Sequence, residues 1–228
     1  MFGQNQILKQ EFKPTLEVVQ IFKSLQNGAP AIFIRLYGCN LRCWYCDVDF
    51  ESFKKTMTLD EILNELEIQK VAFPGPTPLV VITGGEPFRQ DIVPLVGQLV
   101  KHFTVQIETS GTLWIPTFEQ FDDDPDVQVI VSPKTGSIDT RIGERAEAWK
   151  YIITDESIGE DGLPIMSTQH KGAVNKLARP MNGAPVFIQP CDEQNDTVND
   201  WNHKLCYGMA MKFGYQVSLQ LNKILGVE

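Results

Sequence analysis

The sequence predicts an α/β protein with a mostly parallel sheet, because short apolar segments of strand length alternate with amphipathic segments of helix length. Conspicuous polar motifs stand where the apolar segments end, as expected when parallel strands are joined by right-handed crossovers. The chain has 228 residues, 43% of them apolar, which is enough for one domain with a substantial core. We therefore expect residues 1–228 to form a single domain.

The first half of the chain begins with an expected strand over residues 31–36. Residues 58–61, Thr-Leu-Asp-Glu, have the pattern of a capping box that begins a helix. This helix places four apolar side chains on one face: Leu59, Ile62, Leu63 and Leu66. A strand over residues 79–82 follows, and Asp91 is expected to cap a second helix. The apolar stripe of that helix consists of Ile92, Leu95, Val96 and Leu99.

The second half continues with four expected strands, at residues 105–107, 127–131, 151–153 and 186–188. A last helix is expected over about 197–213, with four side chains facing the core: Val198, Trp201, Leu205 and Met209. Residues 216–219 are expected to close the sheet as a strand. The connection over residues 155–185 is long and contains several Gly and Pro, which predicts an elaborated loop or lid.

The composition favours a compact enzyme that acts on a small molecule. The formal net charge of −9 argues against a nucleic-acid surface, which needs basic side chains to neutralise phosphates. The N-terminal residues contain no apolar signal-peptide core, and no run approaches membrane-spanning length, so we expect no membrane partner. Five cysteines, an odd number with three close together, suit a reducing cytoplasm better than a disulfide framework.

Three cysteines with the spacing C-x3-C-x2-C follow the first expected strand: Cys39, Cys43 and Cys46. A fully ligated 4Fe–4S cluster takes four cysteines, so three would leave one iron open to a substrate or cofactor that receives an electron. A structural zinc site is the alternative, and it needs four ligands. The histidines are scattered, but Asp47, Asp49 or a distant cysteine could complete such a site. The other two cysteines, Cys191 and Cys206, are most simply buried free thiols.

Polar motifs follow the expected strands at residues 83–87, 108–111, 132–134 and 189–190. Because ligands gather at the carboxyl ends of parallel strands, we expect one edge of the sheet to carry the chemistry. Gly84 and Gly85 allow a ligand close to the backbone, and Glu86 can pair with an ammonium group. A plain turn is the alternative for this Gly-Gly-Glu-Pro segment.

Five other polar side chains are candidates for the same site. Ser132 and Lys134 offer a hydroxyl and a cation that suit a carboxylate or a ribose. Thr109 and Ser110 fit either a turn or a ligand contact. Arg35 stands inside an apolar strand, so it must leave the sheet or pair with an anion. We interpret Arg35 as a clamp for a substrate carboxylate, with a structural ion pair as the alternative.

The cysteine spacing, with aromatic Tyr45 before the last cysteine, resembles the radical S-adenosylmethionine (SAM) pattern. Over most of its length the chain resembles the 7-carboxy-7-deazaguanine synthase family. The resemblance rests on motifs that follow in family order, at residues 21–26, 33–43, 83–87, 108–112, 132–134, 189–190 and 220–223. It implies a partial, shortened radical-SAM (β/α) barrel, a homodimer, a 4Fe–4S cluster and an external one-electron reductant such as flavodoxin.

The resemblance also implies a reaction and a set of contacts. A 5′-deoxyadenosyl radical abstracts hydrogen from C6 of 6-carboxy-5,6,7,8-tetrahydropterin, and ring contraction with loss of ammonia gives 7-carboxy-7-deazaguanine. The implied SAM contacts, together with those at the strand ends, are Tyr45, Asp47, Gly84, Gly85, Glu86, Thr109, Ser110, Ser132, Pro133, Lys134, Gln189, Pro190, Cys191 and Asp192. The implied substrate contacts are Leu25, Gln26, Asn27, Arg35 and Thr83.

The chain departs from the family pattern at three places. Val48 stands where the family has a hydroxyl that serves as a magnesium ligand. Because Mg²⁺ takes oxygen ligands, Asp49 is the expected substitute, with Asp47, substrate and water, or no metal at all as alternatives. Residues 27–29 read Asn-Gly-Ala where the family has Gly-Glu-Gly, and Asn222 replaces a family histidine.

Two other functions remain open at this point. A radical-activating enzyme for a glycyl-radical partner would have the same cysteine spacing and a similar size, but it would need a protein-docking face. A non-enzymatic iron–sulfur or zinc-dependent binding module is the third possibility. The Leu-Gln segment at residues 25–26 and the Ser-Pro-Lys segment at residues 132–134 favour the synthase.

Overall fold

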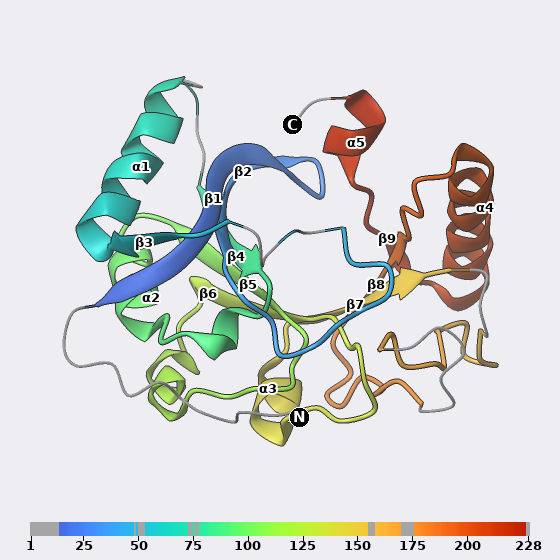
Figure 1. Cartoon of the computed structure of the whole chain (residues 1–228). Coiled ribbons are helices and arrows are strands. Elements are labelled where there is room, and N and C mark those ends of the chain that lie inside the picture. Colours follow the sequence, from blue (N-terminus) through green and yellow to red (C-terminus); the bar gives the residue numbers. More distant parts are fainter. Residues whose placement is uncertain are drawn as a thin grey trace.

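The computed structural model of the chain shows a curved, mostly parallel sheet with helices packed against it (Figure 1). It describes residues 14–47, 49, 53–72, 75, 78–154, 158–169 and 176–226. Within these residues the sheet has nine strands in the order β3-β1-β2-β4-β5-β6-β7-β8-β9. From β4 onward each new strand is added beside the previous one, and the curved sheet has the form of a barrel that is not closed (Figure 1). The predicted α/β fold class, a partial barrel, is confirmed.

The three strands at one end of the sheet are antiparallel neighbours: β1 (Thr15–Gln26), β2 (Ala29–Leu36) and β3 (Lys55–Thr58). Six strands continue from β2 in parallel: β4 (Leu79–Gly84), β5 (Thr104–Thr109), β6 (Val127–Val131), β7 (Ala148–Ile153), β8 (Val186–Pro190) and β9 (Gln216–Val217). The helices are α1 (Leu59–Ala72), α2 (Val93–Leu99), α3 (Thr140–Arg145), α4 (Asp196–Phe213) and α5 (Leu221–Leu225). Short 3₁₀ helices span Pro87–Arg89 and Pro116–Phe121. All six strands expected before the last helix are present. The closing strand is shorter than expected, because β9 ends at Val217.

The first strand, β1, was not expected from the sequence. It forms a hairpin with β2 whose two-residue turn, Asn27-Gly28, has φ angles of 49° and 86°. Two positive φ angles are what a type I′ turn requires, and Asn-Gly is the preferred pair for it. Phe22 and Phe33 stack across the hairpin with ring centroids 5.3 Å apart. Asn27, predicted to contact substrate, is therefore a turn residue, and its side-chain oxygen accepts a hydrogen bond from Ser218 Oγ at 2.7 Å.

The capping signals at α1 and α2 act as predicted. At α1 the Thr58 N–H donates to the Glu61 carboxylate at 2.8 Å, and the Glu61 N–H donates back to Thr58 Oγ1 at 3.2 Å. Before α2 the Asp91 carboxylate accepts the Val93 N–H at 3.2 Å. The α2 stripe is buried over its whole length, from Ile92 through Leu95 and Val96 to Leu99.

The prediction for α4 is wrong at one position of its inward face. Trp201 is 57% exposed, while Asn202 and Cys206 are the buried residues of this helix. The Asn202 amide takes the inward position because it donates to the Cys191 carbonyl and to the Glu193 carboxylate, each at 3.1 Å. These two bonds satisfy the amide nitrogen, whereas the buried Oδ1 of Asn202 has no partner among the described residues. Residues 158–169 and 176–185 of the predicted elaborated loop contain two isolated β-bridges and no helix.

Side chains that alternate along each strand point either into the hydrophobic core or into a cavity. In β2, Ile32, Ile34 and Leu36 are fully buried in the core, whereas Phe33 and Arg35 line a cavity on the opposite face. In β7, Trp149, Tyr151 and Ile153 are fully buried, whereas Lys150 and Ile152 line the same cavity. Because side chains of a strand point to opposite faces in turn, one face packs under the helices and the other is free for chemistry.

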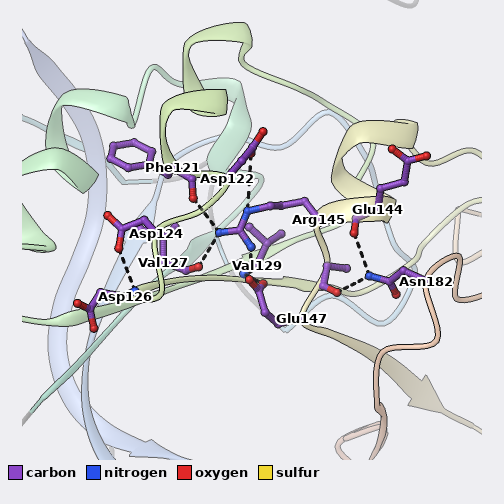
Figure 2. Close-up of polar contacts among 11 residues, drawn as sticks. Phe121, Asp122, Asp124, Asp126, Val127, Val129, Glu144, Arg145, Glu147 and Asn182 are labelled. Atoms are coloured by element: carbon purple, nitrogen blue, oxygen red, sulfur yellow. Dashed lines mark hydrogen bonds and ion pairs between the residues drawn. The ribbon is translucent and has the colours of Figure 1, made fainter.

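The contact between β6 and β7 is the narrowest of the parallel sheet from β2 to β7, since only Ile130 with Ala148 and Val131 with Trp149 pair across it. Figure 2 shows how side chains bridge the region beyond these pairs. Arg145 donates to the carbonyls of Val127 at 2.7 Å and Phe121 at 3.1 Å, and it is paired with Glu147. The carboxylate of Glu147 in turn accepts the Val129 N–H (Figure 2).

We predict that Arg145→Ala lowers the free energy of unfolding by about 2–4 kcal/mol, because it removes the Arg145 donor from two carbonyls and the ion-pair partner from Glu147. The Phe121 carbonyl keeps the Asp124 N–H as a donor. Urea unfolding measures the change. Arg141→Ala, which removes an exposed ion pair with Asp139 from the same helix, should cost no more than about 1 kcal/mol. Equal losses in the two variants would contradict the bridging role of Arg145.

Candidate active site

A cavity of about 850 Å³ lies on the inner face of the sheet and reaches the carboxyl ends of its strands. Its lining includes most of the residues predicted for the site: Leu25, Gln26, Arg35, Cys39, Cys43, Tyr45, Cys46, Asp47, Thr83, Gly84, Gly85, Thr109, Ser110, Ser132, Lys134, Gln189 and Asp192. The prediction that one edge of the sheet collects the polar motifs is therefore confirmed.

The loop that carries the cysteines is held by the end of β4. The Gly85 N–H donates to the Leu36 carbonyl at 3.0 Å, and the Glu86 N–H donates to the Gly38 carbonyl at 2.9 Å. A Cβ atom on Gly85 would lie 1.9 Å from the Gly38 oxygen, and one on Gly84 would lie 2.2 Å from the Leu36 oxygen. Both glycines are therefore required for this close approach of two backbones, in addition to any contact with a ligand.

Three thiols of this loop line one wall of the cavity. Burial raises the pKa of Cys39 to about 11, so a thiolate at this position needs a positively charged partner such as bound iron. In the described part of the chain, no three His, Cys, Asp or Glu side chains converge on a point that would hold one metal ion.

Cys43 receives donors from a distant segment. Thr168 Oγ1 donates to Cys43 Sγ at 2.9 Å, and Gln169 Nε2 lies 3.5 Å from the same sulfur. Tyr45, the aromatic residue before Cys46, is half-buried in the cavity wall, and desolvation of its hydroxyl raises its pKa well above the usual value. The cysteine loop is thus packed on the protein side and open toward the cavity.

Glu86 was predicted to pair with the ammonium group of a ligand, but it lies behind the residues that line the cavity. It is 1% exposed, and its carboxylate accepts hydrogen bonds from Thr109 Oγ1 at 2.6 Å, Ser110 Oγ at 2.6 Å, the Ser110 N–H at 2.8 Å and the Phe88 N–H at 3.2 Å. These four protein donors leave little capacity for a ligand. Glu86 therefore ties the ends of β4 and β5 together.

Arg35 has the geometry expected of an anion clamp. Its guanidinium lies over the Phe22 ring at 5.0 Å and donates to Gln20 Oε1 at 3.4 Å. Its buried Nε atom has no hydrogen-bond partner, and the structure shows no ion pair of Arg35 among the described residues. Burial lowers the pKa of Arg35, while the nearby Asp47 opposes this shift. The alternative of a structural ion pair finds no support in this part of the chain.

The floor of the cavity carries a charged group that the sequence analysis did not select. Lys150 Nζ contacts both carboxylate oxygens of Glu108 at 2.7 Å, and Gln26 Nε2 donates to Glu108 at 2.7 Å. Burial alone would raise the pKa of Glu108, but Lys150 and Gln26 hold it below the usual value. Burial lowers the pKa of the neighbouring Lys134. Glu108 and Lys150 are charges inside apolar strands, the same signal that identified Arg35.

The C-terminal helix α5 closes one side of the cavity. Lys223 Nζ lies 2.6 Å from the Asp47 carboxylate and 2.7 Å from the Asp192 carboxylate. Its hydrogen bond holds the pKa of Asp192 at about 2. Lys223 therefore joins the cysteine loop to the loop after β8, and Asn222 beside it also lines the cavity.

Five predicted contact residues lie outside the lining, besides Glu86. Asn27 is in the β1–β2 turn, and Pro133, Pro190 and Cys191 are buried. Asp49 is exposed, and Val48 lies outside the described residues. Cys191 and Cys206 are buried free thiols as predicted, and burial raises the pKa of each to about 12. In the described part of the chain, no helix has both the length and the apolar character needed to cross a membrane.

Comparison with known proteins agrees with this geometry. Residues 33–153 match the model of the Radical SAM superfamily. The 7-carboxy-7-deazaguanine synthase of Rhodospirillum rubrum is 39% identical over 225 residues, which cover 93% of each chain. The protein of the same name from Rickettsia prowazekii is 36% identical, and the match covers 93% of this chain and 89% of that protein. The crystal structure of QueE from Escherichia coli has the same fold, with a TM-score of 0.61 at 23% identity over 90% of this chain and 94% of its own. The chain therefore belongs to the 7-carboxy-7-deazaguanine synthase family of the Radical SAM superfamily.

Proposed function

We propose that this enzyme converts 6-carboxy-5,6,7,8-tetrahydropterin to 7-carboxy-7-deazaguanine with release of ammonia, the product being the one named for its relatives. The observation that carries the proposal is one cavity lined both by three cysteine thiols and by Arg35, whose buried Nε has no hydrogen-bond partner among the described residues. A reconstituted sample incubated with this pterin and SAM should release the deazaguanine acid, detected by mass spectrometry. Absence of this product, with SAM cleaved, would point to another substrate.

Family membership implies a 4Fe–4S cluster and SAM, and the residues of the cavity suit both. Cys39, Cys43 and Cys46 would hold the cluster by three irons. When bound, the cluster and SAM supply the electron and the 5′-deoxyadenosyl radical that abstracts hydrogen. A glycyl-radical activating enzyme and a zinc-dependent module are not favoured, because relatives that match along nearly the whole chain are synthases.

The remaining lining residues divide between cofactor and substrate. For SAM we propose Tyr45, Asp47, Gly84, Gly85, Thr109, Ser110, Ser132, Lys134, Gln189 and Asp192, which line the cavity. For the pterin we propose Leu25, Gln26, Arg35 and Thr83. Arg35 would pair with the substrate carboxylate, since its guanidinium has a free donor and lies in a half-buried position where an ion pair is strong. The Glu108–Lys150 pair keeps the floor polar and fixed.

The enzyme class requires a small-molecule substrate and a reductant. More specifically, we propose that a flavodoxin-like protein delivers the electron, that the enzyme acts in the cytoplasm as a homodimer, and that it binds no nucleic acid or membrane. The net charge of −9 supports the absence of a nucleic-acid partner.

The cluster ligands can be tested by single substitutions. Cys39→Ala, Cys43→Ala and Cys46→Ala should each abolish the visible absorption of the cluster and turnover, because each removes one of only three ligands. Cys191→Ala and Cys206→Ala should retain both, since these thiols are buried outside the cavity lining. A full cluster in any of the first three variants would exclude that cysteine as a ligand.

The clamp can be tested with Arg35→Lys. Charge-assisted hydrogen bonds contribute roughly 1.5–3 kcal/mol each, and lysine cannot form the bidentate pair, so the Kd for the pterin should rise by about tenfold or more. The Kd for SAM should stay unchanged. Equilibrium binding of each ligand measures both values, and Arg141→Lys, outside the cavity, is the control. Unchanged pterin binding in Arg35→Lys would assign Arg35 a structural role.

Magnesium is the third test, and we propose that Asp49 replaces the hydroxyl ligand that Val48 lacks. If so, turnover rises with Mg²⁺ in the wild type, and Asp49→Ala loses this response because the carboxylate oxygen is gone. Val48→Thr supplies the comparison by restoring a hydroxyl. An Asp49→Ala enzyme with the same Mg²⁺ response as the wild type would show that this carboxylate is not the ligand.

A further inference from the structure

A segment 125 residues distant in the sequence lies against the cysteine loop and has no role in the function proposed above. Thr168 Oγ1 donates to Cys43 Sγ at 2.9 Å, and Gln169 Nε2 reaches the same sulfur at 3.5 Å. Gln169 Nε2 also donates to Thr168 Oγ1 at 3.2 Å. Two polar side chains thus converge on one cysteine, and the amide also donates to the hydroxyl that lies closer to the sulfur.

The attachment of this segment does not depend on the Thr168 hydroxyl. The Thr168 N–H donates to the Lys134 carbonyl at 3.0 Å, and the Thr168 carbonyl accepts the Trp44 N–H at 3.1 Å. These two backbone bonds join the segment to the loop after β6 and to the cysteine loop. The hydroxyl also lies 3.2 Å from the Lys134 carbonyl, which already accepts the backbone N–H. It also hydrogen-bonds with the Tyr45 hydroxyl, so the sulfur of Cys43 is the nearest cysteine atom among several polar groups that this hydroxyl contacts.

A hydrogen bond to a ligand sulfur stabilises negative charge on it. One-electron reduction of a 4Fe–4S cluster from the 2+ to the 1+ state places part of the added charge on the ligand sulfurs, so donors to them favour the reduced state. Thr168 is 5% exposed, and a hydrogen bond is stronger at such a buried position than in water.

We propose that Thr168 and Gln169 are positioning residues that raise the reduction potential of the cluster by donating to the sulfur of Cys43. The inference rests on the proposed function, because it requires that Cys43 binds a cluster. Through these donors the segment around residue 168 helps to set how readily an external reductant can load the enzyme with an electron.

The test compares Thr168→Val with Thr168→Ser in the reconstituted, full-length enzyme. Valine keeps the shape and the backbone bonds but removes the donor, so the midpoint potential of the 2+/1+ couple should become more negative. Serine keeps the hydroxyl and should keep the potential close to that of the wild type. Ser167→Ala is the control, since this neighbouring hydroxyl donates to the Lys134 carbonyl and accepts the Gln169 backbone N–H rather than bonding to a cysteine sulfur, so the potential should not change. Dithionite titration followed by electron paramagnetic resonance measures the potential at equal iron content.

Gln169→Glu provides a second variant. The carboxylate can still accept the Arg42 N–H, which Gln169 Oε1 accepts at 2.9 Å, but it cannot donate to sulfur. It also adds a negative charge beside the sulfur, so the potential should become more negative for both reasons, and Thr168→Val remains the variant that removes a donor without changing the charge. If both Thr168→Val and Gln169→Glu have the wild-type potential, the proposed role of these two residues is wrong, while the proposed function of the enzyme stands. Failure of both variants to assemble a cluster also overturns that role, because the segment is then required for structure. A wild-type enzyme without a four-iron cluster overturns the proposed function as well.

Discussion

The backbone contact between the end of β4 and the cysteine loop is the constraint on which the site depends. The N–H groups of Gly85 and Glu86 donate to the carbonyls of Leu36 and Gly38. No side chain could fit at Gly84 or Gly85. The buried carboxylate of Glu86 then fastens Thr109 and Ser110 at the end of β5. Three adjacent strand ends are thereby fixed relative to the cysteine thiols, before any ligand is bound.

The charges of the cavity differ in how fully the protein satisfies them. Glu108 is neutralised by Lys150 and hydrogen-bonded by Gln26, so it contributes a fixed polar floor. Asp47 and Asp192 share the ammonium group of Lys223. Arg35 differs from these groups, since its buried Nε has no partner among the described residues. A buried donor without an acceptor costs free energy unless a ligand accepts its hydrogen bond. Arg35 therefore indicates a substrate with an anionic group.

Segments that are remote in sequence complete the walls around the cysteine loop. Residues 167–169 approach it from one side and supply Thr168 and Gln169 to the sulfur of Cys43. Helix α5 attaches to the same loop through Lys223, which pairs with Asp47. The environment of the thiols is therefore a property of the whole fold rather than of the cysteine motif.

The sequence by itself determined the α/β class, the cysteine motif and the edge of the sheet that carries the site, because apolar periodicity and strand-end motifs are local patterns. Charge inside an apolar strand identified Arg35, and the same rule applied to Glu108 and Lys150 would have found the floor of the cavity. Only the tertiary structure decided that Glu86 is a buried tie, that Asn27 is a turn residue, and that Asn202 rather than Trp201 faces the core. It alone brought Thr168 to Cys43 and Lys223 to Asp47 and Asp192, because these contacts join residues more than 30 positions apart and leave no periodic signal in the chain.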